Sequence, residues 1–185
     1  MNLPTSIILV AGVFAVSVTM ASGQDESVAS AEVPLSYCAS NPGFADFDFW
    51  VGKWNVYSND DTRQLQGTNS ITKHYEACLL KEEWHGAAGG GGFSINYYNS
   101  VSGEWRQVWV ADGYSIDYVG GLDKDGAMVL EGQIYGYQKN TATPFRGTWT
   151  PNEDGSVVQR FDVYDKANHT WTVWFEGLYV KKEQG

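Results

Sequence analysis

Residues 102–136 read SGEWRQVWVADGYSIDYVGGLDKDGAMVLEGQIYG, and this stretch decides the fold. Within it, Trp105, Gln107 and Trp109 alternate with charged or aliphatic residues, as happens where successive side chains point to opposite faces of a strand. Lys124-Asp125-Gly126 is a turn-forming sequence between two segments rich in aromatic and β-branched residues. The stretch therefore predicts short antiparallel strands joined by tight turns, at 104–110, 115–120 and 127–136.

The same alternation between short apolar runs and turn sequences continues on both sides of this stretch. Further strands are predicted at 51–58, 66–75, 78–85, 92–98, 145–150, 156–164 and 170–180. Ten strands with tight connections form an antiparallel meander, and closing the meander into a barrel removes its two unpaired edges. The predicted fold class is therefore all-β, a roughly ten-stranded antiparallel up-and-down barrel with room inside for a small ligand.

The composition agrees with β-structure and excludes several classes of function. The chain has 185 residues, which suggests one domain, and 15% of them are aromatic, with 21 glycines. The formal net charge is -10, and the 12 lysines and arginines are scattered along the chain. Nucleic acid and anionic membrane surfaces are therefore unsuitable partners, because both require a basic surface.

The first residues have the pattern of a targeting segment. Residues 4–21 carry no charge, and their apolar core at 7–16 is too short to span a membrane comfortably. Small residues follow it, which suits cleavage by a signal peptidase. We interpret 1–23 as a signal peptide, 24–43 as a flexible leader and 44–185 as the barrel domain of a secreted or periplasmic protein. The alternative is an uncleaved membrane anchor.

Two cysteines, Cys38 and Cys78, are present in the chain. In an exported protein an even number suggests one disulfide, which would tie the leader to the barrel, whereas two unpaired thiols are the alternative. Asn168, in Asn168-His169-Thr170, is the one predicted N-glycosylation site, and it matters only in a eukaryotic host.

Polar residues near the middle of several inward-facing segments predict a cavity. A buried polar group without a partner costs about 1–3 kcal/mol, so these side chains must bond to one another, to water or to a ligand. A self-satisfied network that fixes the strand register is the alternative, and the strand of Arg146 can be phased either way. The predicted ligand-binding residues are Glu82, Trp84, Asn96, Tyr98, Trp105, Gln107, Trp109, Met128, Arg146, Gln159 and Phe161.

Glu82 is the ionisable residue best suited to chemistry inside the barrel. Burial among tryptophans would raise the pKa of its carboxyl group, and a raised pKa suits a general acid or base. An ion pair with Arg146, or a Glu82 that faces solvent, is the alternative. Glu82 and Tyr98 are the candidate proton-transfer residues if the protein is an enzyme, a question that the residues leave open.

No metal site or cofactor is expected. His74, His85 and His169 lack the close spacing of zinc ligands, and the calcium-loop-like start at Asp123 has Ile134 where an EF-hand needs glutamate. The glycine-rich segment 86–92 lacks the Gly-Lys-Ser/Thr ending of a phosphate loop. We interpret it as a hairpin loop and a candidate lid over the barrel.

Residues 47–54, Phe-Asp-Phe-Trp-Val-Gly-Lys-Trp, contain the Gly-x-Trp motif that opens the calycins, the superfamily of lipocalins and fatty-acid-binding-protein-like barrels. From about residue 46 to 180 the chain resembles a family of secreted calycin-like proteins that open with F-D-F-W-x-G-x-W. Cys-Leu-Leu-x-Glu-x-Trp at 78–84 and Trp-x-Gln-x-Trp at 105–109 belong to the resemblance. It implies a barrel closed at one end by Trp54 under Lys181 or Lys182.

The resemblance also implies that the barrel binds small lipophilic molecules, as calycins do. The favoured interpretation is a monomer that binds a small, flat, largely apolar molecule between aromatic walls and a polar floor. A barrel-cavity enzyme of the isomerase or cyclase type is the first alternative. An extracellular interaction protein whose exposed aromatic residues bind a partner is the second.

Overall fold

The computed structural model of the protein describes residues 36–183. The predicted signal peptide and residues 24–35 of the predicted leader lie outside the described residues. A short α-helix and two 3-10 helices precede the strands: α1 (Tyr37–Ser40), η1 (Pro42–Ala45) and η2 (Asp48–Trp50). None of the described helices is long and apolar enough to cross a membrane.

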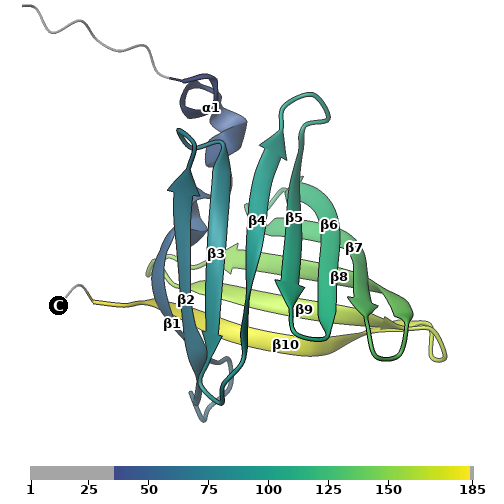
Figure 1. Ribbon diagram of the computed structural model, residues 1–185. Coiled ribbons are helices and arrows are strands. Elements are labelled where there is room, and N and C mark those ends of the chain that lie inside the picture. The colour runs from purple at the N-terminus through teal and green to yellow at the C-terminus, as the bar shows by residue number, and fades with distance from the viewer. Residues whose placement is uncertain (1–35, 184–185) are drawn as a thin grey trace, which may run out of the picture. The chain divides into compact units, whose positions relative to one another are not determined.

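Ten strands follow and form one closed antiparallel barrel (Figure 1). They are β1 (Gly52–Ser58), β2 (Leu65–His74), β3 (Leu79–Gly86), β4 (Gly91–Asn99), β5 (Glu104–Ala111), β6 (Tyr114–Leu122), β7 (Met128–Gly136), β8 (Thr141–Pro151), β9 (Val157–Asp165) and β10 (Thr170–Lys181). Each strand pairs with its neighbours in sequence, and β10 pairs with β1 to close the sheet. The predicted all-β, ten-stranded up-and-down barrel is confirmed.

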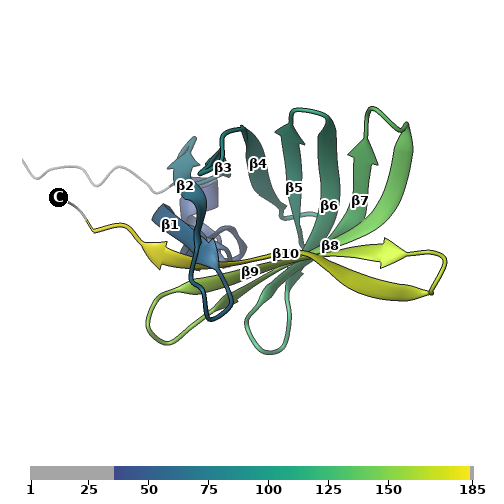
Figure 2. The ribbon, with the colours of Figure 1, turned by 90° about the horizontal axis from the view of Figure 1, so that it is seen from below.

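The strand directions turn through a large angle around the barrel. In Figure 1, β2 to β5 run nearly upright, whereas β8 to β10 run across the view, and Figure 2 shows the same arrangement from below. This rotation follows from the right-handed twist of each strand, which accumulates from neighbour to neighbour. As a result, side chains from opposite sides of the barrel meet in its interior at different angles.

Tight turns hold the meander together where the sequence predicted them. In the turn between β6 and β7, the Asp123 carboxylate accepts hydrogen bonds from the backbone N–H of Asp125 and Ala127, at 2.9 and 3.0 Å. Gly126 follows with φ of +84°, a left-handed conformation that glycine adopts without steric cost. The chain can therefore reverse within a few residues, and β6 and β7 pair along their whole length.

The segment before β1 closes one end of the barrel. Phe47 and Trp50 are fully buried and stack with ring centroids 4.9 Å apart, and both contact Trp149. The Trp54 indole N–H donates to the Trp50 carbonyl oxygen at 2.9 Å, and Lys181 Nζ lies 5.6 Å from the Trp54 ring. The described residues thus fit the closing role that the calycin resemblance implies for Trp54.

A disulfide joins this N-terminal segment to the barrel. Cys38 in α1 bonds to Cys78, just before β3, with their Cα atoms 5.0 Å apart. The predicted pairing is therefore confirmed. Residues 36–43, which the sequence analysis placed in a leader, contain α1 and the start of η1.

Candidate functional site

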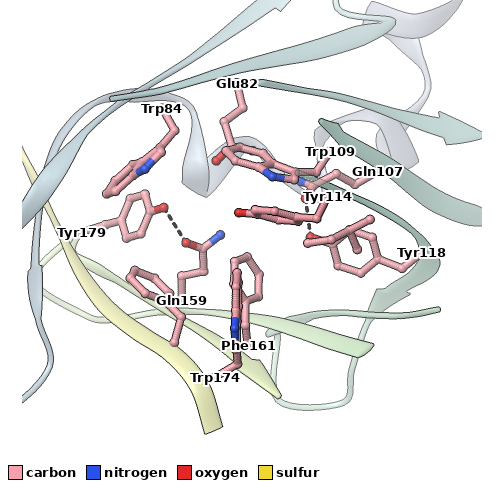
Figure 3. Close-up of a pocket in the computed structure, with 12 residues that line it drawn as sticks. Glu82, Trp84, Gln107, Trp109, Tyr114, Tyr118, Gln159, Phe161, Trp174 and Tyr179 are labelled. Atoms are coloured by element: carbon pink, nitrogen blue, oxygen red, sulfur yellow. Dashed lines mark hydrogen bonds between the residues drawn. The ribbon is translucent and has the colours of Figure 1, made fainter. Parts of the chain in front are cut away.

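The barrel contains a cavity of about 110 Å³ at the end opposite the N-terminal segment (Figure 3). The residues that line it come from β3, β5, β6, β9 and β10. The residues that line it are Glu82, Trp84, Gln107, Trp109, Tyr114, Ile116, Tyr118, Gln159, Phe161, Trp174, Phe175 and Tyr179. This volume is smaller than the roughly 300–1,000 Å³ of most drug-sized ligand sites, so only a small group fits wholly inside.

Aromatic rings form a nearly continuous wall around this cavity. The Trp174 ring lies 5.8 Å from Tyr114 and 6.2 Å from Phe161, and Phe161 lies 5.9 Å from Phe175. Trp84 and Trp109 face them from the other side in Figure 3. Trp174 is 48% exposed and therefore marks the mouth, where a ligand enters or protrudes.

Two glycines make room for the indoles of Trp84 and Trp109. A Cβ atom at Gly67 would lie 2.7 Å from the Trp84 ring, and one at Gly92 would lie 2.5 Å from the Trp109 ring. Each distance is too short for a side chain, so each ring occupies the space that a Cβ atom on the neighbouring strand would take. A larger residue at either glycine would displace the indole, so these glycines help to set the size of the cavity.

The floor of the cavity is polar and is organised around Glu82. Glu82 is 3% exposed, and its carboxyl group accepts hydrogen bonds from Asn69 Nδ2 at 2.7 Å and from Ser94 Oγ at 2.6 Å. Asn69 and Ser94 occupy the strands on either side of β3, so the network crosses three adjacent strands. Neither donor carries a charge, and no ion pair of the described residues involves Glu82.

A chain of hydrogen bonds leads from β6 to Glu82. Tyr118 donates to Gln107 Oε1, Gln107 Nε2 donates to Asn96 Oδ1, and Asn96 Nδ2 donates to Ser94 Oγ at 2.8 Å. Ser94 then donates to Glu82, so every donor in this chain points toward the carboxylate. The network satisfies most of the buried polar groups of the floor, as burial requires.

A second branch leads to β9 on the other side. Asn69 Nδ2 also donates to the Tyr179 hydroxyl oxygen at 3.1 Å, and Tyr179 donates to Gln159 Oε1 at 2.5 Å. The Gln159 amide nitrogen donates to no described residue, and in Figure 3 the amide group points into the cavity. The indole N–H of Trp109 is likewise buried without a hydrogen-bond partner among residues 36–183.

Burial controls the ionisation of the groups on the floor. Desolvation raises the pKa of Glu82 to about 7, and the hydrogen bonds from Ser94 and Asn69 oppose that shift only in part. Burial also raises the pKa of Tyr118 and Tyr179 well above the ordinary tyrosine value, with the Glu82 charge acting in the same direction. The floor therefore holds neutral tyrosines and a carboxyl group whose pKa lies near neutral pH.

Nine of the eleven predicted ligand-binding residues lie in three locations. Glu82, Trp84, Gln107, Trp109, Gln159 and Phe161 line the cavity. Asn96 lies beneath the floor as a member of the hydrogen-bond network. Trp105 and Met128 are buried in the core of the barrel, and neither lines the cavity.

Tyr98 and Arg146 are not among the residues that line the cavity, where they were expected. The Tyr98 ring contacts Phe44 and Trp105 near the closed end, with centroids 5.3 and 6.1 Å apart. Arg146 points out of the barrel because its neighbours Phe145 and Gly147 point in. Its guanidinium group pairs with Asp162 at 3.4 Å, so it does not form an ion pair with Glu82.

Sequence reasoning missed half of the cavity lining. Tyr114, Ile116 and Tyr118 alternate along β6, a pattern that the sequence contains and that would have placed them on one inward face. Trp174 is different, because a register shift between Val173 and Phe175 interrupts the alternation along β10. Alternation alone could not show that Trp174 and Phe175 both reach the cavity.

The remaining predictions concern metal binding, glycosylation and the glycine-rich segment. The described residues contain no cluster of three or more histidine, cysteine or carboxylate groups able to hold a metal ion. Asn168 is exposed in the turn between β9 and β10, where its Nδ2 donates to Asp165 at 2.7 Å. The glycine-rich segment forms the hairpin between β3 and β4, directly after Trp84, and its role as a lid stays a prediction.

No protein-family model matches the chain, and no curated protein matches it. The closed ten-stranded barrel is compatible with a calycin-like fold. Membership of a particular family stays a prediction.

Proposed function

We propose that the protein binds a small, largely apolar molecule in the aromatic cavity of the barrel. The observation that carries this proposal is the combination of a space of about 110 Å³, aromatic walls and unused polar donors on one floor. A cavity of about 150 Å³ holds one benzene molecule, so the somewhat smaller space here accepts a short chain or part of a single ring, with the remainder at the mouth. The rest of a larger ligand would pass Trp174 into solvent.

The polar floor supports a ligand with at least one polar end. The Gln159 amide nitrogen donates to none of the described residues, whereas its Oε1 accepts from Tyr179. The Trp109 indole N–H lies near the Tyr114 hydroxyl but makes no hydrogen bond of normal geometry with a described residue. A ligand oxygen or nitrogen would satisfy either donor and fix the orientation of the bound molecule.

The disulfide supports a location outside the cytoplasm. Disulfides form and persist in oxidising compartments and are rare where thiols are kept reduced. A barrel stabilised by Cys38–Cys78 is therefore suited to a secreted or periplasmic binding protein.

Two tryptophans on the same strand provide the test of binding. Trp174 forms the mouth of the cavity, whereas Trp171 packs outside the barrel against Tyr164, with centroids 5.3 Å apart. Trp174→Ala should weaken the binding of a neutral one-ring probe such as benzyl alcohol about tenfold or more, measured by calorimetry, and Trp171→Ala should leave it unchanged. Equal affinities for wild type and Trp174→Ala would contradict the proposed site.

A second candidate function is catalysis of an isomerase or cyclase type in the same cavity. The specific observation in its favour is the pKa of Glu82 near 7, which suits a group that both accepts and donates a proton. In this case Glu82→Gln would abolish turnover of the substrate while the enzyme still bound it. Tyr98 plays no part in this candidate, because it lies outside the cavity.

A further inference from the structure

The floor of the cavity contains one acidic group and no basic group. Of the described residues that line the cavity, none is lysine, arginine or histidine, and Glu82 is the acidic one. Most buried carboxylates in proteins are paired with a cation, because an unpaired buried charge is costly. Glu82 has only the neutral donors Asn69 and Ser94.

The groups that face Glu82 from each neighbouring strand are all uncharged. They are Asn69 and Ile71 of β2, Ser94 of β4, Gln107 of β5, Tyr114 and Tyr118 of β6, and Tyr179 of β10. The adjacent Glu83 and His85 belong to the outer face of β3 and are exposed. Among residues 36–183 the carboxylate therefore has no counter-ion.

The carboxylate retains the capacity to accept more hydrogen bonds. Each of its two oxygens accepts one bond from the protein, whereas an ionised carboxylate has about four lone-pair sites. Glu82 reaches the cavity in Figure 3, next to the ring of Trp109. A donor group of a bound molecule can thus contact it without breaking the network.

The aromatic wall, like the Glu82 carboxylate, attracts positive charge. The faces of tryptophan, tyrosine and phenylalanine rings carry negative potential and attract a cation within about 6 Å of the ring centre. Seven such rings line the cavity in addition to Trp174: Trp84, Trp109, Tyr114, Tyr118, Phe161, Phe175 and Tyr179. The net charge of -10 adds a long-range attraction for cations.

We propose that the ligand is a small organic cation, a protonated amine whose ammonium group pairs with Glu82 and whose apolar part lies between the aromatic rings. This inference rests on the proposed function, since it names the chemical class of the molecule that the cavity binds. The ammonium group replaces the missing counter-ion, and the rings contact the methylene or aromatic part of the ligand. A neutral ligand of the same shape would leave Glu82 without a partner charge.

Benzylamine and benzyl alcohol form a matched pair of probes, because they have the same ring and nearly the same size but only benzylamine carries a charge. At pH 8, calorimetric titration of the wild-type protein should show benzylamine binding at least tenfold more tightly than benzyl alcohol. From pH 6 to pH 8, the affinity for benzylamine should increase about tenfold, because only the ionised form of Glu82 pairs with it. The affinity for benzyl alcohol should not increase.

Glu82→Gln should remove the preference for benzylamine and its pH dependence. Glu83→Gln is the matched control, because it removes the same charge from the adjacent outward residue and should change neither. The pH comparison on the wild-type protein stands even if Glu82→Gln does not fold.

The possible failures are distinguishable. If benzyl alcohol binds as tightly as benzylamine at pH 8, the cation inference is overturned and the aromatic binding cavity remains. If neither probe binds to the wild-type protein at millimolar concentration, the proposed function is overturned and the cation inference with it.

Discussion

Removal of the Glu82 charge should change how the stability of the protein depends on pH. In the unfolded chain the carboxyl group has an ordinary pKa of 4.5, and burial raises it to about 7 in the folded protein. Between these two values the folded protein keeps a proton that the unfolded chain has released. The free energy of unfolding therefore falls as pH rises through this range.

The size of this effect follows from the two pKa values. Each unit of pKa difference corresponds to about 1.4 kcal/mol, so ionisation of Glu82 costs the folded protein about 3 kcal/mol once the pH exceeds 7. Stability from this group is fully present below pH 4.5 and is lost as the pH rises through 7. Glu82→Gln has no proton to lose, so its stability relative to wild type should increase by about 2–3 kcal/mol from pH 5 to pH 8.5.

Urea unfolding at several pH values, followed by tryptophan fluorescence, measures this difference. Altered hydrogen bonds to Asn69 and Ser94 should change the free energy of unfolding of Glu82→Gln by a constant amount. This constant difference does not affect how the free energy of unfolding depends on pH. Glu83→Gln should run parallel to wild type above pH 5, because the Lys81 ammonium group lowers the pKa of Glu83. A pH-independent difference between Glu82→Gln and wild type would refute the buried, uncompensated carboxylate.

Two further changes test the network and the closed end. Gln107→Leu leaves the Tyr118 hydroxyl and the Asn96 carbonyl oxygen without their partner, so it should lower the free energy of urea unfolding by about 1–3 kcal/mol for each orphaned group. An unchanged unfolding midpoint would contradict this part of the network. Replacing Cys38 and Cys78 with serine removes a link between residues 40 positions apart and should cost up to about 4 kcal/mol in the chain-entropy model. The affinity for benzyl alcohol should remain, because the disulfide lies at the opposite end; a large loss of affinity in a folded variant would contradict that separation.

The strands were predictable because their side chains alternate so regularly. In β5, Trp105 and Gln107 are buried, and their neighbours Glu104 and Arg106 are more exposed. The alternation of residue types along the strand is therefore enough to assign its two faces. Arg146 was ambiguous for a physical reason. The inward positions around it are Phe145, Gly147 and Trp149, and a glycine in the middle contributes no side chain to the pattern.

The size of the cavity was not predictable from alternation. A barrel of ten strands has a wide interior. Here Phe47 and Trp50, which come from the segment before the first strand, fill part of it. Short 3-10 helices have no strong periodicity, so the sequence did not show that these rings enter the barrel. Trp105 and Met128 were expected to contact a ligand, but the same filling makes them part of the core.

The pairing of β1 with β10 has a consequence for how the protein is made. Each hairpin forms between neighbouring strands, but the last seam joins Ser58 to Gly177 and Trp54 to Lys181, nearly the full length of the domain apart. Such non-local contacts slow folding, since a long loop of chain must be ordered before they form. On the ribosome the sheet stays open until its tenth strand emerges, with two unpaired edges exposed to other chains. Closure of the barrel therefore cannot precede the synthesis of β10, and until then the two open edges are sites where other chains can pair.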